Sequence, residues 1–196
     1  FFARGLAYIV LQGKIMYGFS ETFRFLGAGH FFSIPTPIVF SAFALLIFYC
    51  LLRYTPFGVD IYALGSDEES SRLSGIKTRN RLIWVYTLSG LLSAFAGIIY
   101  TSRLNAAEPV IGEFFALDAI AAVVLGGTLL EGGEGSIVGT MIGALIITVI
   151  INGMNLLGIP SLLQSFVLGC LILIMIASQH AGGKLKGIPY FFKPWN

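Results

Sequence analysis

The densest cluster of charged side chains in this sequence lies between two long apolar stretches, in the segment 65–76. Ser66 is followed three residues later by Glu69, which is the spacing of a capping box, where each side chain accepts a hydrogen bond from the other residue's backbone N–H. Asp67, Glu68 and Glu69 would place negative charge at the positive end of a helix dipole. The chemistry that this pattern supports is helix capping and charged recognition.

The same segment carries a signal for the end of that helix. Gly75 can adopt the left-handed conformation that closes a helix, so we expect a helix over residues 67–74. A helix of about two turns is too short to be stable alone in water, so it must pack on something. That support is either the chain's own bundle or another protein.

The composition indicates the class of protein. Hydrophobic residues make up 56% of the chain, charged residues 11%, and the mean hydropathy is +0.86. A soluble domain carries about a quarter charged residues. The sequence therefore predicts an all-α polytopic transmembrane helix bundle. The net charge of +2 is too small to suggest a nucleic-acid partner.

Apolar stretches without charged residues predict the membrane crossings. Pro35–Leu52 and Leu82–Ser102 are each one crossing, and Gly135–Gly183 is long enough for two, with turn chemistry over 152–161. Ala119–Leu130 is short, so it is either a half-helix or a crossing that its flanks complete. We expect a crossing, because a re-entrant segment would place the C-terminal tail on the wrong side of the membrane. Two sets of small residues recur every four positions and predict faces for close helix packing. They are Ser89, Ser93 and Gly97, and Gly135, Gly139 and Gly143.

Residues 1–13 are too few to cross a bilayer and lack the features of a signal peptide, so we expect them to end a helix of an N-terminally truncated chain. Residues 14–34 are expected to form a loop. Lysine and arginine predict the orientation, because cytoplasmic loops are enriched in them. The loop 53–81 and the C-terminal tail from His180 contain eight lysine and arginine residues, whereas the loops around Lys14 and Arg103 contain three. We therefore place the loop 53–81 and the tail in the cytoplasm.

No group of residues predicts catalysis, a metal site or a cofactor. Cys50 and Cys170 lie in separate apolar stretches, and His30 has no partner at a metal-binding spacing. The glycine-rich segment 126–135 lacks the Lys-Ser or Lys-Thr of a phosphate-binding loop.

Three polar residues near the ends of apolar stretches are candidates for a substrate pathway. Asp118 could contact a substrate or could cap a helix that begins at Ala119. Asn152 and Asn155 could bind a hydroxyl-rich solute or could form a turn.

The segment 62–76 reads YALGSDEESSRLSGI and resembles the cytoplasmic segment of permease subunits of bacterial ribose-type monosaccharide ABC importers. The resemblance continues in LDAIAAVVLGGT at 117–128, GGEGSIVGT at 132–140 and NGMNLLG at 152–158. Ser66-Asp67 replaces the Gly-Asn that is usual there, and Ser70-Ser71 replaces Ala-Ala.

The resemblance implies that residues 1–196 are the C-terminal part of a single transmembrane permease domain with a cytoplasmic coupling loop at 53–81. It implies cytoplasmic ABC ATPase subunits, an extracytoplasmic sugar-binding protein and a second permease subunit as partners in the bacterial inner membrane. The chain itself would be no enzyme. The expected ATPase-coupling residues are Ser66, Asp67, Glu68, Glu69, Arg72, Leu73, Ser74 and Gly75.

Three other interpretations remain. A branched-chain amino acid permease of the same general type usually lacks the Arg-Leu-Ser-Gly-Ile ending found here. A secondary transporter would need charged groups within its spans for ion coupling, and the main apolar stretches have none. A membrane scaffold would have no use for a capped docking helix.

The aromatic loop at 17–25 could contact a binding protein or lie at the membrane interface.

Overall fold

The computed structural model describes residues 2–109, 112 and 115–182, and these residues are predominantly helical. The chain divides into two compact units, residues 1–113 and residues 114–196. Among the described residues, three helices are long and apolar enough to cross a membrane: α3 (Thr36–Tyr54), α6 (Thr78–Leu104) and α8 (Ile137–Leu156). The predicted all-α polytopic membrane fold is confirmed.

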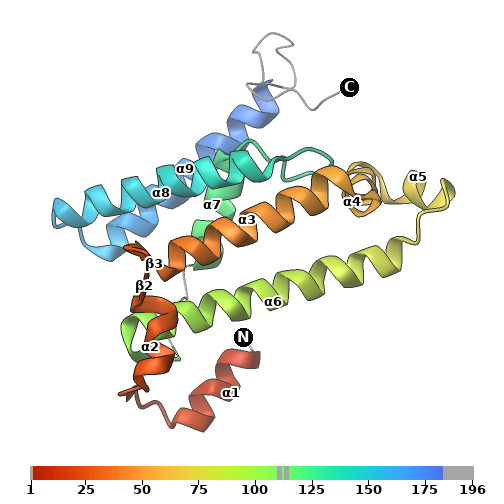
Figure 1. Ribbon diagram of the computed structural model, residues 1–196. Helices are drawn as coiled ribbons and strands as arrows, with labels where there is room; N and C mark the ends of the chain where they lie inside the picture. The colour runs from red at the N-terminus through yellow and green to blue at the C-terminus, as the bar shows by residue number, and fades with distance from the viewer. Residues whose placement is uncertain (1, 110–111, 113–114, 183–196) are drawn as a thin grey trace. The chain divides into compact units, whose positions relative to one another are not determined.

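In the first unit, α3 and α6 run side by side in opposite directions (Figure 1). Two short helices, α4 (Pro56–Ser66) and α5 (Glu68–Leu73), lie at one end of this pair, and α2 (Glu21–Ala28) lies at the other. Proline near the start of α3 and of α4 suits the first helical turn, where no N–H is needed. The unit also contains α1 (Phe2–Leu11).

The segment 14–34 is more ordered than predicted. It contains α2, and two pairs of two-residue strands flank that helix. Strand β1 (Met16–Tyr17) pairs antiparallel with β4 (Ala106–Ala107), and β2 (His30–Phe31) pairs with β3 (Ile34–Pro35). The prediction of a loop over residues 14–34 was therefore wrong. Contacts with the distant end of α6 stabilise α2, and the local sequence gives no clear signal for that helix.

A buried serine fixes α2 to the end of α6. Ser102 is fully buried, its Oγ accepts a hydrogen bond from the Gly27 N–H at 2.8 Å, and its hydroxyl donates to the Phe23 carbonyl at 2.6 Å. One side chain thus satisfies two backbone groups of a helix more than 70 residues away in the sequence. The contact defines the end of the α3–α6 pair opposite to α4 and α5.

The second unit contains α7 (Phe115–Leu125), α8 and α9 (Ser161–Gly182). Its buried core joins the three helices and consists of Ala121, Ala122, Ile147 and Leu168. Two glycines of α8 allow close contact with the end of α7. A Cβ on Gly139 would lie 2.1 Å from the Gly126 carbonyl oxygen, and one on Gly143 would lie 2.0 Å from that of Ala122. These two positions confirm the predicted packing face.

Several predicted boundaries need correction. Helix α7 ends at Leu125, so the predicted apolar segment to Leu130 is not continuous helix. Its 11 residues rise about 16 Å, roughly half of a hydrocarbon core, and do not complete the expected crossing alone.

The other small-residue face, around Ser93 and Gly97 on α6, is exposed within this chain. The two crossings predicted within 135–183 correspond to α8, which is a candidate span, and α9, whose part Ser161–Ala177 is a shorter apolar helix.

Candidate coupling site

The N-terminus of α5 is capped by Asp67, one residue later than predicted. Its Oδ1 accepts hydrogen bonds from the backbone N–H of Glu69 at 2.9 Å and of Ser70 at 3.4 Å, and its Oδ2 accepts from the Ser70 hydroxyl at 2.6 Å. Ser66 instead ends α4, where its hydroxyl donates to the Tyr62 carbonyl at 3.1 Å. The predicted capping box between Ser66 and Glu69 is therefore wrong, because a preceding helix already includes Ser66.

These hydrogen bonds also affect the charge of the cap. The Ser70 hydroxyl, followed by the backbone N–H groups of Ser70 and Glu69, lowers the pKa of the Asp67 carboxyl below its ordinary value of 3.8. The carboxylate is the form that accepts all three bonds. Asp67 is thus ionised at neutral pH and complements the helix dipole together with Glu68 and Glu69.

Helix α5 ends at Leu73, and Gly75 closes it in the left-handed conformation, as predicted. The glycine has φ +90°, and its N–H donates to the Arg72 carbonyl at 3.0 Å. The N–H of Ile76 donates to the Ser71 carbonyl at 3.1 Å, which completes a Schellman motif. Ser74 is the C-cap residue, and its hydroxyl donates to the Ser70 carbonyl at 2.9 Å. Both ends of this six-residue helix are closed by its own chain.

The outer face of α5 combines charge with one exposed leucine. Leu73 is 79% exposed, whereas Ser71, on the opposite face, is 4% exposed. The exposed charged residues around Leu73 include Glu69 and Arg72, which form an ion pair at 3.6 Å. We call the set Glu68, Glu69, Arg72 and Leu73 the α5 face. An apolar side chain within a charged rim is a common arrangement at protein interfaces.

The sequence interpretation missed α4 and the ion pair that holds it. Arg81 of α6 donates to Asp60 Oδ2 from Nε at 2.7 Å, and its Nη2 lies 2.6 Å from the same oxygen. The guanidinium carbon also lies 5.4 Å from the centre of the Phe57 ring. The sequence signal for α4 is Pro56 at the helix start, followed by an apolar run, and the predicted loop over 53–81 is wrong for this segment.

The predicted substrate-pathway residues occupy other positions than expected. Asp118 lies in the first turn of α7, which begins at Phe115, so it is not the residue before a helix. Asn152 is exposed and lies within α8, so it forms no turn. Asn155 lies in the last turn of α8.

Gln164 completes the turn between α8 and α9 and was not singled out from the sequence. Its Nε2 donates to Asn155 Oδ1 and to the Ile159 carbonyl, both at 2.8 Å. Asn155 is therefore partly engaged in this turn, where the chain reverses through Gly158. Asn152 and Asn155 lie three residues apart in α8 and thus close to one face of it.

The comparisons with known proteins agree with this architecture. A protein-family model described as "Branched-chain amino acid transport system / permease component" matches residues 3–176. The chain belongs to this family. No solved structure matches it.

Three relatives of this permease chain have names that refer to sugars. The ribose import permease protein RbsC of Bacillus subtilis (strain 168) is 48% identical over 175 residues, which are 88% of this chain and 54% of that protein. The L-arabinose transport system permease protein AraH of Escherichia coli (strain K12) is 40% identical over 183 residues, with coverages of 93% and 56%. The D-allose transport system permease protein AlsC of the same strain is 38% identical over 174 residues, with coverages of 89% and 53%. The chain spans about half the length of the curated relatives it matches.

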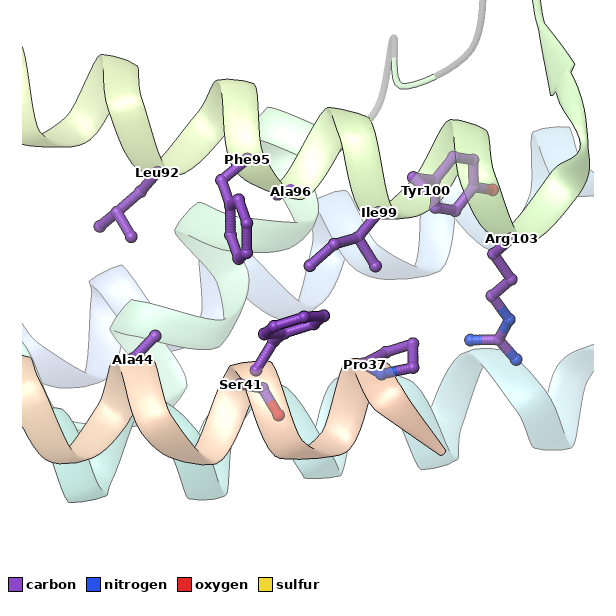
Figure 2. Close-up of a pocket in the computed structure, with 10 residues that line it drawn as sticks. Pro37, Ser41, Ala44, Leu92, Phe95, Ala96, Ile99, Tyr100 and Arg103 are labelled. Atoms are coloured by element: carbon purple, nitrogen blue, oxygen red, sulfur yellow. The ribbon is translucent and has the colours of Figure 1, made fainter. Parts of the chain in front are cut away.

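A groove of about 400 Å³ lies between α3 and α6 of the permease chain. Figure 2 shows side chains of both helices pointing into it, with Phe95 in the middle and Arg103 at one end. The Phe40 and Phe95 rings meet edge to face with their centres 5.5 Å apart. A sugar needs several hydrogen-bonding groups around it, and this lining is mostly carbon. The polar residues of the lining are Ser41, Tyr100 and Arg103.

Proposed function

We propose that this chain is the transmembrane subunit of an ATP-driven importer of a monosaccharide, and that the α5 face binds the ATPase subunits. The observation that carries this proposal is the α5 face itself: a helix closed at both ends that presents an exposed leucine within a charged rim. It lies beside the ends of two membrane helices, opposite to α2 (Figure 1). A surface of this kind fits a partner that docks from one side of the membrane.

The side of the membrane follows from charge. Five lysine or arginine residues lie between α3 and the start of α6 or within their adjoining ends: Arg53, Arg72, Lys77, Arg79 and Arg81. Because cytoplasmic segments are enriched in such residues, α5 would face the cytoplasm, where ATP is available. ATP binding and hydrolysis would take place on the partner subunits, and their closure would move α5.

The proposed cargo is a monosaccharide, in the class of ribose, arabinose and allose, which the names of the relatives specify. An extracytoplasmic binding protein would deliver it, and a second permease subunit, identical or different, would complete the pathway. Asp118, Asn152 and Asn155 are the residues we propose for that pathway. The exposed amides of Asn152 and Asn155 suit hydrogen bonds to sugar hydroxyls. The second candidate is a branched-chain amino acid, which the family description favours.

The test uses the full-length permease in membranes with its candidate ATPase and binding-protein subunits. We expect Glu69→Arg, which reverses a charge on the α5 face, and Leu73→Ser, which removes its apolar centre, to abolish ATPase association and sugar uptake. The matched control is Glu108→Arg, the same reversal at an exposed position after α6, at the opposite end of the α3–α6 pair. It should leave ATPase association unchanged.

Three outcomes would contradict the proposal. Uptake by the permease without any ATPase would support a secondary transporter. Normal ATPase association in Glu69→Arg and Leu73→Ser would show that the α5 face is not the docking surface. Competition of uptake by leucine, with none by ribose, arabinose or allose, would replace the sugar with a branched-chain amino acid.

A further inference from the structure

Helix α4 is joined firmly to α3. The backbones meet so closely at Gly58 that a Cβ there would lie 1.9 Å from the Leu52 carbonyl oxygen. The Thr55 hydroxyl, between the two helices, donates to the Leu51 carbonyl at 2.6 Å. The corner between α3 and α4 therefore has little room to change its angle without a clash or a lost hydrogen bond.

Helix α4 is also joined to α5 without a linker. Asp67 is both the residue after α4 and the N-cap of α5. Its backbone N–H donates to the Ala63 carbonyl of α4 at 3.1 Å, while its carboxylate accepts from the first turn of α5. A displacement of α5 must therefore act on the end of α4 through one shared residue.

The third connection runs from α4 to α6 and depends on side chains alone. The Oδ2 atom of Asp60 lies 2.7 Å from Nε and 2.6 Å from Nη2 of Arg81. Phe57, one turn earlier on α4, packs under the guanidinium group. The two charged side chains are partly buried, with exposed fractions of 21% for Asp60 and 33% for Arg81.

Two connections reach α6 at different points along the helix. The turn from α5 to α6 reaches only the N-terminus of α6, at Thr78. The ion pair joins α4 to α6 about one turn further along, at Arg81. We propose that Asp60 and Arg81 are a positioning pair that transmits the displacement of α5 to the membrane helix α6. This inference rests on the proposed function, because it assumes that α5 is displaced by bound ATPases.

The consequence is a specific defect when the pair is broken. The α5 face does not include either residue, so the ATPases should still bind. Their closure would then move α4 without moving α6, and ATP would be hydrolysed with less transport. We therefore expect the amount of sugar imported per ATP hydrolysed to fall.

The experiment measures ATPase association, ATP hydrolysis and sugar uptake of the full-length permease with its partner subunits. Asp60→Asn and Arg81→Gln each remove one charge and should lower the ratio of uptake to hydrolysis while association persists. Arg81→Lys keeps the charge but supplies a single nitrogen, so its ratio should lie between those of Arg81→Gln and the wild type. Arg79→Gln removes the same charge two residues away, from an exposed side chain, and should match the wild type.

The double variant Asp60→Arg with Arg81→Asp restores opposite charges in exchanged positions. It should recover much of the ratio that each single change loses, which a general loss of stability would not do. Ratios indistinguishable from the wild type in Asp60→Asn and Arg81→Gln would overturn the inference. So would a ratio that falls equally in Arg79→Gln. Failure of the proposed function itself would appear in the wild type, as uptake without ATPases or absence of ATPase association.

Discussion

Gly143 lies so close to Ala122 that any side chain on the glycine would overlap the Ala122 carbonyl oxygen, since a Cβ would come within 2.0 Å of it. The atom in the way belongs to the backbone of α7, so α7 and α8 would have to separate. We expect Gly143→Ala to lower the free energy of unfolding by about 1–3 kcal/mol, the range for overpacked cores.

The measurement is the midpoint of thermal unfolding in detergent. Gly153→Ala is the matched control, because it makes the same change in the same helix where nothing lies within 4 Å of the new Cβ. An equal loss in both variants would mean that helix propensity or the detergent, and not the contact with α7, determines the effect.

The cap of α5 gives a prediction that separates two neighbouring residues. Asp67→Ala removes the acceptor for three hydrogen bonds, so protection of the α5 backbone N–H groups against hydrogen exchange should fall about fivefold. Ser66→Ala removes only a bond to the Tyr62 carbonyl within α4 and should leave α5 protection unchanged. The reverse pattern would restore the capping box expected from the sequence.

The same cap should respond to acid. The folded pKa of Asp67 is depressed, so its contribution is complete above the ordinary value of 3.8 and is lost as the pH falls through the lower folded pKa. Hydrogen-exchange protection of α5, corrected for the intrinsic rate, should therefore decline below about pH 4 in the wild type. Asp67→Asn, which has no proton to gain in this range, should lose that dependence. A decline of equal size in Asp67→Asn would assign the effect to another carboxyl group.

Ser102 gives a prediction for the opposite end of the α3–α6 pair. Ser102→Ala removes the buried hydroxyl that accepts from the Gly27 N–H and donates to the part-buried Phe23 carbonyl, which should cost about 1–3 kcal/mol. Because α2 depends on this contact, proteolysis within 14–34 should become faster. Ser93→Ala, on the exposed part of the same helix, removes only a bond to the Ser89 carbonyl and should change neither property. Unchanged proteolysis in Ser102→Ala would show that the strand pairs hold α2 without it.

Local sequence patterns were sufficient to predict several features of the fold. Charge-free stretches predicted α3, α6, α8 and α9, because bilayer thickness sets a minimum length for apolar helices. Gly75 predicted the end of α5, since few other residues adopt its φ of +90°. These signals need no knowledge of the rest of the chain.

The missed features depend on contacts between distant residues. Helix α2 is fixed by Ser102, 75 residues from Gly27, and α4 is fixed by Arg81, 21 residues from Asp60. The cap was assigned to Ser66 because the pattern of a capping box does not reveal that another helix already ends there. For the candidate coupling site, the sequence therefore predicted a helix and its end at Gly75 but not the neighbouring helix α4.

The closure of α5 by its own chain has a consequence for how a partner would meet it. A disordered segment loses about 1–2 kcal/mol of conformational entropy per residue when it becomes ordered on binding. In α5, the carboxylate of Asp67 and the Schellman turn at Gly75 have already fixed the backbone before any partner arrives. A partner that binds α5 would therefore meet a preformed surface, without a folding step to slow its docking or release.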